Sequence, residues 1–196
     1  WSASVIQASP PCRDLSRANL NEIHRDDAMR LVEWTFALID VICPAAYMIE
    51  NVPKMVDCLS YTDAHHRHSH VFELAYYVPQ RRMRAMITNF PLEAYITPLS
   101  TTPLPAKNVL PTTPARIRIM NRYGITSTLN EPSLTIVGAG MYVFDTRSKT
   151  RSPMPIKYAQ VLQGFAYGMD ITRYEPSLTR QRLAIGDAVP PPFIYA

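Results

Sequence analysis

The chain has 196 residues, of which 47% are hydrophobic and 18% are charged, and its formal net charge is +4. These values are typical of a globular protein with one domain, or with one domain and a small second lobe, and the sequence holds no run of 18 or more apolar residues that could span a membrane. Three widely spaced cysteines exclude a disulfide framework and a zinc knuckle, and they favour a reducing, intracellular compartment.

The first half of the chain alternates predicted strands and helices. Short apolar runs predict strands, a stripe of polar positions predicts an amphipathic helix, and prolines end several elements. The predicted elements are a strand over 4–8, a helix over 26–43, a strand over 45–49, a short helix over 54–59, and strands over about 70–78 and 83–89. This order is typical of a parallel sheet with crossover helices and a paired ending. In such sheets the working residues follow the carboxyl ends of strands, where Cys12 and Glu50 stand.

The second half of the chain differs in composition. Residues 90–132 hold seven prolines, which disfavour continuous helix. The alternation from Arg116 to Met120 predicts a strand with two arginines on one face, and residues 153–170 return to a helical pattern. We therefore predict an α/β portion over 1–89, a small lobe over 90–150, and a return to the α/β domain over 151–196.

The positive charge is carried mostly by arginine, with sixteen Arg against four Lys. Arginine binds phosphate bidentately and stacks on rings, so this bias favours a nucleic-acid partner. Between residues 88 and 149 six basic residues face three acidic ones, which gives the lobe an excess of positive charge. An ordinary basic protein would show the same overall charge, so the charge alone decides nothing.

Five short motifs follow one another along the chain. They are Pro10-Pro11-Cys12, Glu50-Asn51-Val52, Gln80-Arg81-Arg82-Met83-Arg84, Leu162-Gln163-Gly164-Phe165 and Ile185-Gly186-Asp187-Ala188-Val189-Pro190. Each motif alone is weak, because a cysteine after a strand is most often a buried structural thiol and a glutamate at a strand end is often a cap or a surface charge. In this order, however, the five motifs resemble the later motifs of the cytosine-5 DNA methyltransferases.

The resemblance implies a fold and a reaction. The fold would be a Rossmann-like α/β sheet of the S-adenosylmethionine-dependent methyltransferases, partial because its first strands are not in the sequence, with a small target-recognition lobe over 90–150. The reaction would transfer a methyl group from S-adenosylmethionine to carbon 5 of cytosine in DNA, on a base flipped out of the duplex. By resemblance Cys12 is the nucleophile, Glu50 holds ring nitrogen 3, and Arg82 and Arg84 bind the base or adjacent phosphates.

The resemblance also assigns contacts to the cofactor and to duplex DNA. Pro11, Asp187 and Val189 would contact S-adenosylmethionine. The residues that would contact DNA are Arg13, Ser16, Gln80, Arg116, Arg118, Arg122, Gln163 and Gly164. The biological setting would be DNA methylation, as in restriction-modification, in the cytoplasm or nucleoid of a bacterial or phage system, or in a eukaryotic nucleus.

The sequence departs from the family pattern in its last and first motifs. Asp187 stands where the family has asparagine, and its negative charge would weaken or reorder cofactor binding. The glycine-rich loop of the first motif, which holds S-adenosylmethionine, does not occur, and the chain opens at Trp1 within a strand-like segment. We therefore expect a fragment or a processed chain, with the cofactor loop supplied by an upstream segment or a second chain.

Two other functions stay open at this stage. A methyltransferase-like module that binds DNA or plays a structural part without catalysis would keep the same fold. An RNA cytosine-5 methyltransferase would share the Pro-Pro-Cys and Glu-Asn-Val motifs, and nothing in residues 90–130 excludes it.

A cluster of histidines precedes the predicted strand over 70–78. His66, His68 and His70 would share one face of an extended segment, next to His65, and could offer imidazoles to a metal. Asp63 is the one acidic residue close to them in sequence, so a solvated strand edge or a phosphate-facing patch explains the cluster better. We predict no metal.

Overall fold

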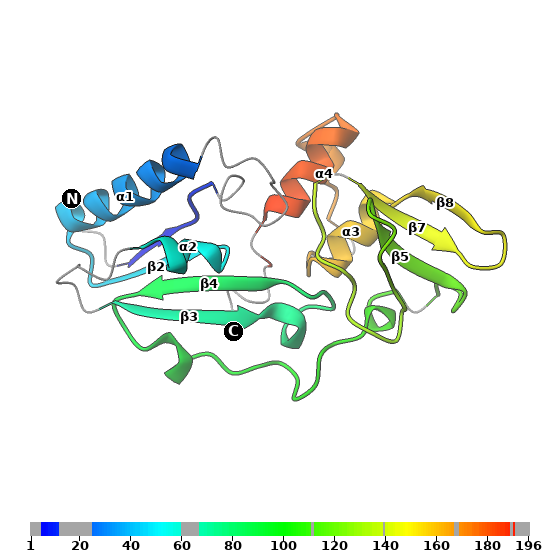
Figure 1. Cartoon of the computed structure of the whole chain (residues 1–196), viewed down its shortest axis with the longest axis horizontal. Helices are drawn as coiled ribbons and strands as arrows, with labels where there is room; N and C mark the ends of the chain where they lie inside the picture. Colours follow the sequence, from blue (N-terminus) through cyan, green and yellow to red (C-terminus); the bar gives the residue numbers. More distant parts are fainter. Residues whose placement is uncertain are drawn as a thin grey trace. The chain divides into compact units, whose positions relative to one another are not determined.

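The structure of the chain is a computed structural model that describes residues 5–11, 25–59, 67–110, 112–138, 140–166, 169–188 and 190. The chain divides into two compact units, and Figure 1 labels most of their helices and strands. Unit 1 comprises Trp1–Phe72 and Met83–Thr97, and unit 2 comprises Glu73–Arg82 and Pro98–Ala196. The predicted segments 90–150 and 151–196 therefore fall mostly within the same unit.

Unit 1 is built on a four-stranded sheet in the order β1-β2-β4-β3. Its elements are β1 (Val5–Ala8), α1 (Arg25–Ile42), β2 (Ala46–Asn51), α2 (Lys54–Cys58), β3 (His68–Glu73), β4 (Met83–Thr88) and a 3-10 turn, η3 (Leu92–Ala94). Every strand and helix that the sequence predicts for this half of the chain is therefore confirmed, although some ends differ.

The sheet is mixed rather than parallel throughout. β1 and β2 are parallel, as the long crossover helix α1 between them requires, but β2 and β4 are antiparallel. The connection between β3 and β4 spans only residues 74–82, too short for the dozen or more residues of a crossover, and the two arrows in Figure 1 point in opposite directions. The prediction of a parallel sheet is therefore correct only for the first pair of strands.

Strand β3 ends before its predicted limit of residue 78. It stops at Glu73, where a 3-10 turn, η2 (Leu74–Tyr76), begins. The Glu73 carboxylate accepts hydrogen bonds from the backbone N–H of Ala75 at 3.1 Å and of Arg82 at 2.8 Å. A side chain that caps a turn in this way offers the backbone an alternative to the strand ladder, which explains the early end.

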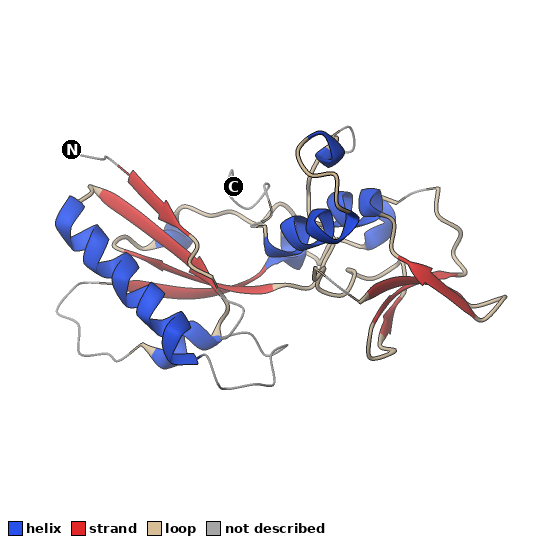
Figure 2. Cartoon of the chain, turned by 90° about the horizontal axis from the view of Figure 1, so that it is seen from above, coloured by secondary structure: helices blue, strands red, loops and turns tan. Residues whose placement is uncertain are grey.

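The helices of unit 1 pack on one face of its sheet, and Figure 2 shows the long helix α1 running alongside the strands. The buried residues of this core are Val32, Phe36 and Ile39 from α1, Tyr47 and Ile49 from β2, Val52, Met55 from α2, and Ile87 from β4. Phe36 and Tyr47 meet edge to face, with ring centroids 6.5 Å apart. Burial of each large side chain contributes about 1.5–3 kcal/mol, so this layer holds the helices against the sheet.

Unit 2 is built on an antiparallel sheet in the order β6-β5-β7-β8. Its elements are η4 (Ala106–Asn108), β5 (Ile117–Asn121), β6 (Thr126–Ser127), β7 (Met141–Asp145), β8 (Thr150–Pro153), α3 (Ile156–Leu162), η5 (Ile171–Arg173) and α4 (Leu178–Asp187). Strand β5 confirms the strand predicted around Arg116–Met120. Helix α3 is shorter than the predicted 153–170, because it begins after Pro155 and Gly164, at φ +88°, ends it.

The helices of both units are short or amphipathic. The 18-residue helix α1 carries exposed charges at Asp27, Arg30, Glu33 and Asp40 along one side. Among the described residues, no helix is both long enough and apolar enough to cross a membrane.

Two glycines allow a close backbone contact in unit 2. A Cβ on Gly186, in α4, would lie 2.4 Å from the backbone nitrogen of Gly138 and 2.7 Å from the carbonyl carbon of Val137. A Cβ on Gly138 would lie 2.9 Å from the Cα of Leu183. Both positions therefore need the absence of a side chain, since backbone atoms cannot move aside as a flexible side chain can.

The substitution Gly186→Ala should destabilise the chain by about 1–3 kcal/mol, because the new methyl group clashes with backbone in a packed contact. Thermal unfolding followed by circular dichroism measures the loss. The matched control is Ala184→Ser, at an exposed position of the same helix, which should change stability by less than about 0.5 kcal/mol. Equal melting temperatures for the two variants would contradict the packing described for α4.

Candidate active site

Three distant segments of unit 1 meet at one edge of its sheet. β1 and β2 are parallel, so their carboxyl ends lie at the same edge, and β4 begins there because it is antiparallel to β2. Ala8 lies opposite Ile49, which brings Ser9 beside Glu50. The start of β4 adds Arg84. The hydroxyl of Ser9, the carboxylate of Glu50 and the guanidinium of Arg84 therefore lie together at this edge.

Glu50 and Arg84 form a buried ion pair at this edge. Arg84 Nε lies 2.7 Å from Glu50 Oε1, and the two residues are 9% and 5% exposed. The Ser9 hydroxyl donates to Glu50 Oε2 at 2.6 Å. A carboxylate taken out of water must be compensated by charge and hydrogen bonds, and here each oxygen has one strong partner.

The geometry leaves the carboxylate able to bind a further donor. An ionised carboxylate can accept about four hydrogen bonds, and the described residues take two of these sites on Glu50, through Ser9 and Arg84. Arg84 is itself oriented, because its Nη1 donates to the carbonyl of Met83 at 2.8 Å. The arrangement can therefore present a fixed, charge-compensated carboxylate to an N–H of a bound ring.

Asn51 ties the segment that follows β1 to the end of β2. It is 1% exposed, its Nδ2 donates to the carbonyl of Pro10 at 3.1 Å, and its Oδ1 accepts from the N–H of Val52 at 2.8 Å. The side chain thus fixes the last described residues before Cys12. Cys12 itself, with Arg13 and Ser16, lies outside the described residues.

Ser9 and Asn51 are site residues that the sequence analysis did not single out. Asn51 stands in the Glu-Asn-Val motif, and its amide could have been suspected of satisfying backbone groups at a strand end. Ser9 is found only through the register of β1 against β2, which a single sequence does not give.

The two arginines of the third motif have different partners. Arg82 belongs to unit 2 and is 3% exposed. Its guanidinium donates to three backbone carbonyls, those of Ile136 at 3.3 Å, Gly186 at 3.0 Å and Ala188 at 3.2 Å. Arg84 is thus the arginine paired with Glu50, and the contacts of Arg82 are those of a residue that holds loops together.

Two glutamines of unit 2 are wholly buried. Gln80 donates from Nε2 to Gln163 Oε1, and its own Oε1 accepts from the N–H of Ile136 at 2.9 Å. Gln163 donates in turn to the carbonyl of Ala188. Gly164 follows at φ +88° and ends α3. Both side chains hydrogen-bond to other described residues of unit 2. These hydrogen bonds would have to break before either glutamine could contact DNA.

The arginines predicted to contact DNA in and next to β5 differ in the partners that hold their side chains. Arg116 is held by Asp145, with 2.9 Å between its Nε and Oδ2. This pairing, together with backbone N–H donors from Arg147 and Ser148, lowers the pKa of Asp145. Arg118 is half-buried opposite Phe144, and the Arg122 guanidinium lies 5.1 Å from the ring centroid of Tyr123.

The residues predicted to contact the cofactor, and the histidines considered as metal ligands, are only partly described. Pro11 and Asp187 are exposed, and Val189 lies outside the described residues. His70 Nε2 lies 2.6 Å from Glu93 Oε2, while His65 and His66 are not described. No group of three potential metal ligands occurs within the described part of the chain.

The fold is similar to solved methyltransferase structures. Methyltransferase EhMeth from Entamoeba histolytica aligns over 95% of this chain and 73% of its own, at 14% identity and a TM-score of 0.58. Dnmt2 methyltransferase from S. pombe aligns over 97% and 75%, at 11% identity and a TM-score of 0.61. No protein-family model matches the sequence, and neither does any curated protein. The likeness confirms the predicted α/β fold class.

The buried ion pair predicts a strong non-additivity between its two residues. Arg84→Met alone should cost about 3–5 kcal/mol of stability, because it leaves the Glu50 carboxylate buried without a counter-charge. The double substitution Arg84→Met with Glu50→Leu should recover most of that loss. Denaturant unfolding of the single and double variants measures the coupling, and additive effects would contradict the pairing.

The Arg116–Asp145 contact predicts a local change in titration. In Arg116→Ala the pKa of Asp145 should rise towards its ordinary value, because the largest cause of its lowering is removed. A carboxyl with a lowered pKa adds stability at neutral pH that is lost as the pH falls through that pKa, so in the variant this increment should be smaller and its remainder should be lost at a higher pH.

A carboxyl-detected NMR titration of Asp145 measures this change. Arg147→Ala is the matched control, since Arg147 acts on Asp145 through its backbone N–H, which the substitution keeps. An Asp145 pKa that moves equally in both variants would contradict the assignment.

Proposed function

We propose that this chain is the catalytic and target-recognition portion of a cytosine-5 DNA methyltransferase. The observation that supports the proposal most is the buried Glu50–Arg84 pair, with Ser9, at the edge where the chain leads to Cys12. The likeness to methyltransferase folds supports it further. The order of the five sequence motifs is consistent with both.

The proposed reaction begins with the nucleophile. The Cys12 thiolate adds to carbon 6 of cytosine, which forms the S–C6 bond and makes carbon 5 nucleophilic. As the S–C6 bond forms, ring nitrogen 3 takes up a proton from solvent, and Glu50 accepts a hydrogen bond from this N–H and so stabilises the electron density that the addition moves into the ring. Arg84 holds the Glu50 carboxylate in place through the 2.7 Å ion pair. After carbon 5 gains a methyl group, the carbon 5 proton passes to water, the S–C6 bond breaks to regenerate the thiolate, and ring nitrogen 3 returns its proton to solvent.

The proposed methyl donor is S-adenosylmethionine, which supplies the methyl group when bound. Pro11 and Asp187, the described residues assigned to it, are an exposed ring and an exposed carboxylate. The two do not by themselves form a site for a sulfonium nucleoside. We therefore propose that an upstream segment or a second chain supplies the rest of its site.

The proposed substrate is duplex DNA. Arg118 and Arg122 have no carboxylate partner among the described residues, so their charges are available to phosphates, whereas Arg116 would first have to leave Asp145. Phosphate contacts of this kind position a duplex without reading its sequence. The target sequence would then depend on other contacts.

A methyl-transfer assay tests the proposal and its two alternatives. Labelled S-adenosylmethionine is offered with duplex DNA carrying randomised sequences and, separately, with transfer RNA. We expect label on DNA, its loss in Cys12→Ser, and a decrease of at least about 10²-fold in Glu50→Gln, because the ring nitrogen loses its charged partner. Label on transfer RNA alone would identify an RNA methyltransferase. Binding without transfer, also after addition of a chain that carries the cofactor loop, would indicate the inactive module.

A further inference from the structure

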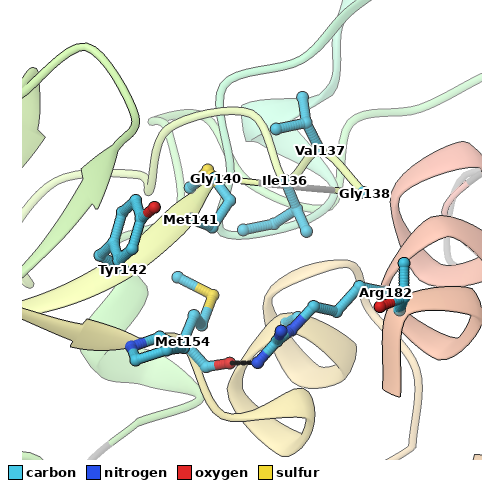
Figure 3. Close-up of a pocket in the computed structure, with 11 residues that line it drawn as sticks. Ile136, Val137, Gly138, Gly140, Met141, Tyr142, Met154 and Arg182 are labelled. Atoms are coloured by element: carbon cyan, nitrogen blue, oxygen red, sulfur yellow. Dashed lines mark hydrogen bonds between the residues drawn. The ribbon is translucent and has the colours of Figure 1, made fainter. Parts of the chain in front are cut away.

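Unit 2 contains a pocket that the proposed reaction does not use. It has a volume of about 170 Å³ and lies beside β7, α3 and α4 (Figure 3). Its lining includes the side chains of Ile136, Met141, Tyr142, Met154 and Arg182. Pockets for drug-sized ligands measure roughly 300–1,000 Å³, so this one has room for a single ring system rather than for a larger molecule.

The walls of the pocket are apolar and aromatic. Ile136, Met141 and Met154 belong to the buried core of unit 2, which makes this part of the wall rigid. Tyr142 adds a half-buried ring. Thioether and aliphatic walls with one aromatic ring offer a planar, polarisable ligand dispersion contacts and a stacking surface.

One charged side chain enters the pocket from α4. Arg182 is half-buried, and its Nη2 makes a single, long hydrogen bond of 3.5 Å to the carbonyl of Met154, as Figure 3 shows. A guanidinium carries five N–H donors, so most of the donors of Arg182 are available to a ligand. The ligand should therefore present oxygen or nitrogen acceptors on its edge.

Two more arginines lie next to the lining residues. The Arg151 guanidinium lies 4.9 Å from the ring centroid of Tyr142, and the stem of Arg122 packs on Gly140, where an added Cβ would meet Arg122 Cβ at 2.8 Å. No lining residue is acidic, and within the described part of the chain Arg122, Arg151 and Arg182 have no carboxylate partner. The surroundings therefore favour a ligand that combines a ring with negative charge.

We infer that this pocket binds an unpaired base of the nucleic-acid substrate, with neighbouring phosphates on Arg122 and Arg151. A base is a single planar ring system whose edge carries acceptors, and unstacked bases are recognised by stacking on aromatic rings and by guanidinium contacts. A lipid chain would not use three arginines, and a metal would find no anionic ligand in the lining. The inference rests on the proposed nucleic-acid substrate, but not on methyl transfer.

A binding experiment without methyl donor tests the inference. Two fluorescent DNA probes of equal length and charge are compared by anisotropy, a hairpin with an unpaired loop and a fully paired duplex. Arg182→Gln should weaken hairpin binding about tenfold and duplex binding less than about twofold. The control is Arg180→Gln, which removes the same charge from an exposed position on the same helix, where Arg180 lies near Glu175. It should affect the two probes equally and weakly.

A second variant blocks the pocket without changing the charge. Thr179→Trp, at an exposed lining position, should weaken hairpin binding to a similar extent, whereas Leu178→Trp, at the neighbouring exposed position outside the lining, should not. Equal effects of Arg182→Gln and Arg180→Gln, or no effect of Thr179→Trp, would overturn the inference. The binding assay contains no methyl donor, so its result can be interpreted even if the chain does not transfer methyl groups.

Discussion

The buried ion pair between Glu50 and Arg84 is the constraint on which the candidate site depends. A carboxylate that is 5% exposed is stable only if charge and hydrogen bonds replace its lost water. Here they come from β4 and from the residue that follows β1, so the pair also fixes three segments against one another. The antiparallel direction of β4 is what makes this possible, since it brings the start of that strand to the ends of the other two.

A second set of polar contacts plays the corresponding role in unit 2. Its many prolines prevent long regular elements, so backbone carbonyls in its loops need side-chain donors. Arg82 and Gln163 donate to such carbonyls, and Gln80 accepts from the N–H of Ile136, all three from buried positions. The two arginines of the third motif therefore have different roles. Arg84 compensates the Glu50 carboxylate in unit 1, and Arg82 binds backbone carbonyls in unit 2. The pocket beside Arg182 has rigid walls because it borders the same core.

Much of this fold could be predicted from the sequence, and the exceptions have physical reasons. The strand over 5–8, helix α1 and strand β2 follow from apolar runs and periodicity that end at prolines. The antiparallel direction of β4 depends on the short connection before it and on its pairing with β2. The early end of β3 depends on the Glu73 carboxylate, which accepts a hydrogen bond from the distant backbone N–H of Arg82. Motif order pointed to Glu50, but no local pattern separates Arg84 from Arg82 or finds Ser9, because these depend on strand register.

The most direct measurement is the location of a covalent adduct. A pool of duplexes with randomised flanks carries pyrimidin-2-one in place of the target cytosine, a ring electrophilic enough at carbon 6 to trap a thiolate without any methyl donor. We expect an adduct that peptide mass spectrometry maps to Cys12, and whose yield falls in Glu50→Gln. Two results would contradict the proposed mechanism: duplex that binds without an adduct at Cys12, or an adduct whose yield is the same in Glu50→Gln as in the unchanged chain.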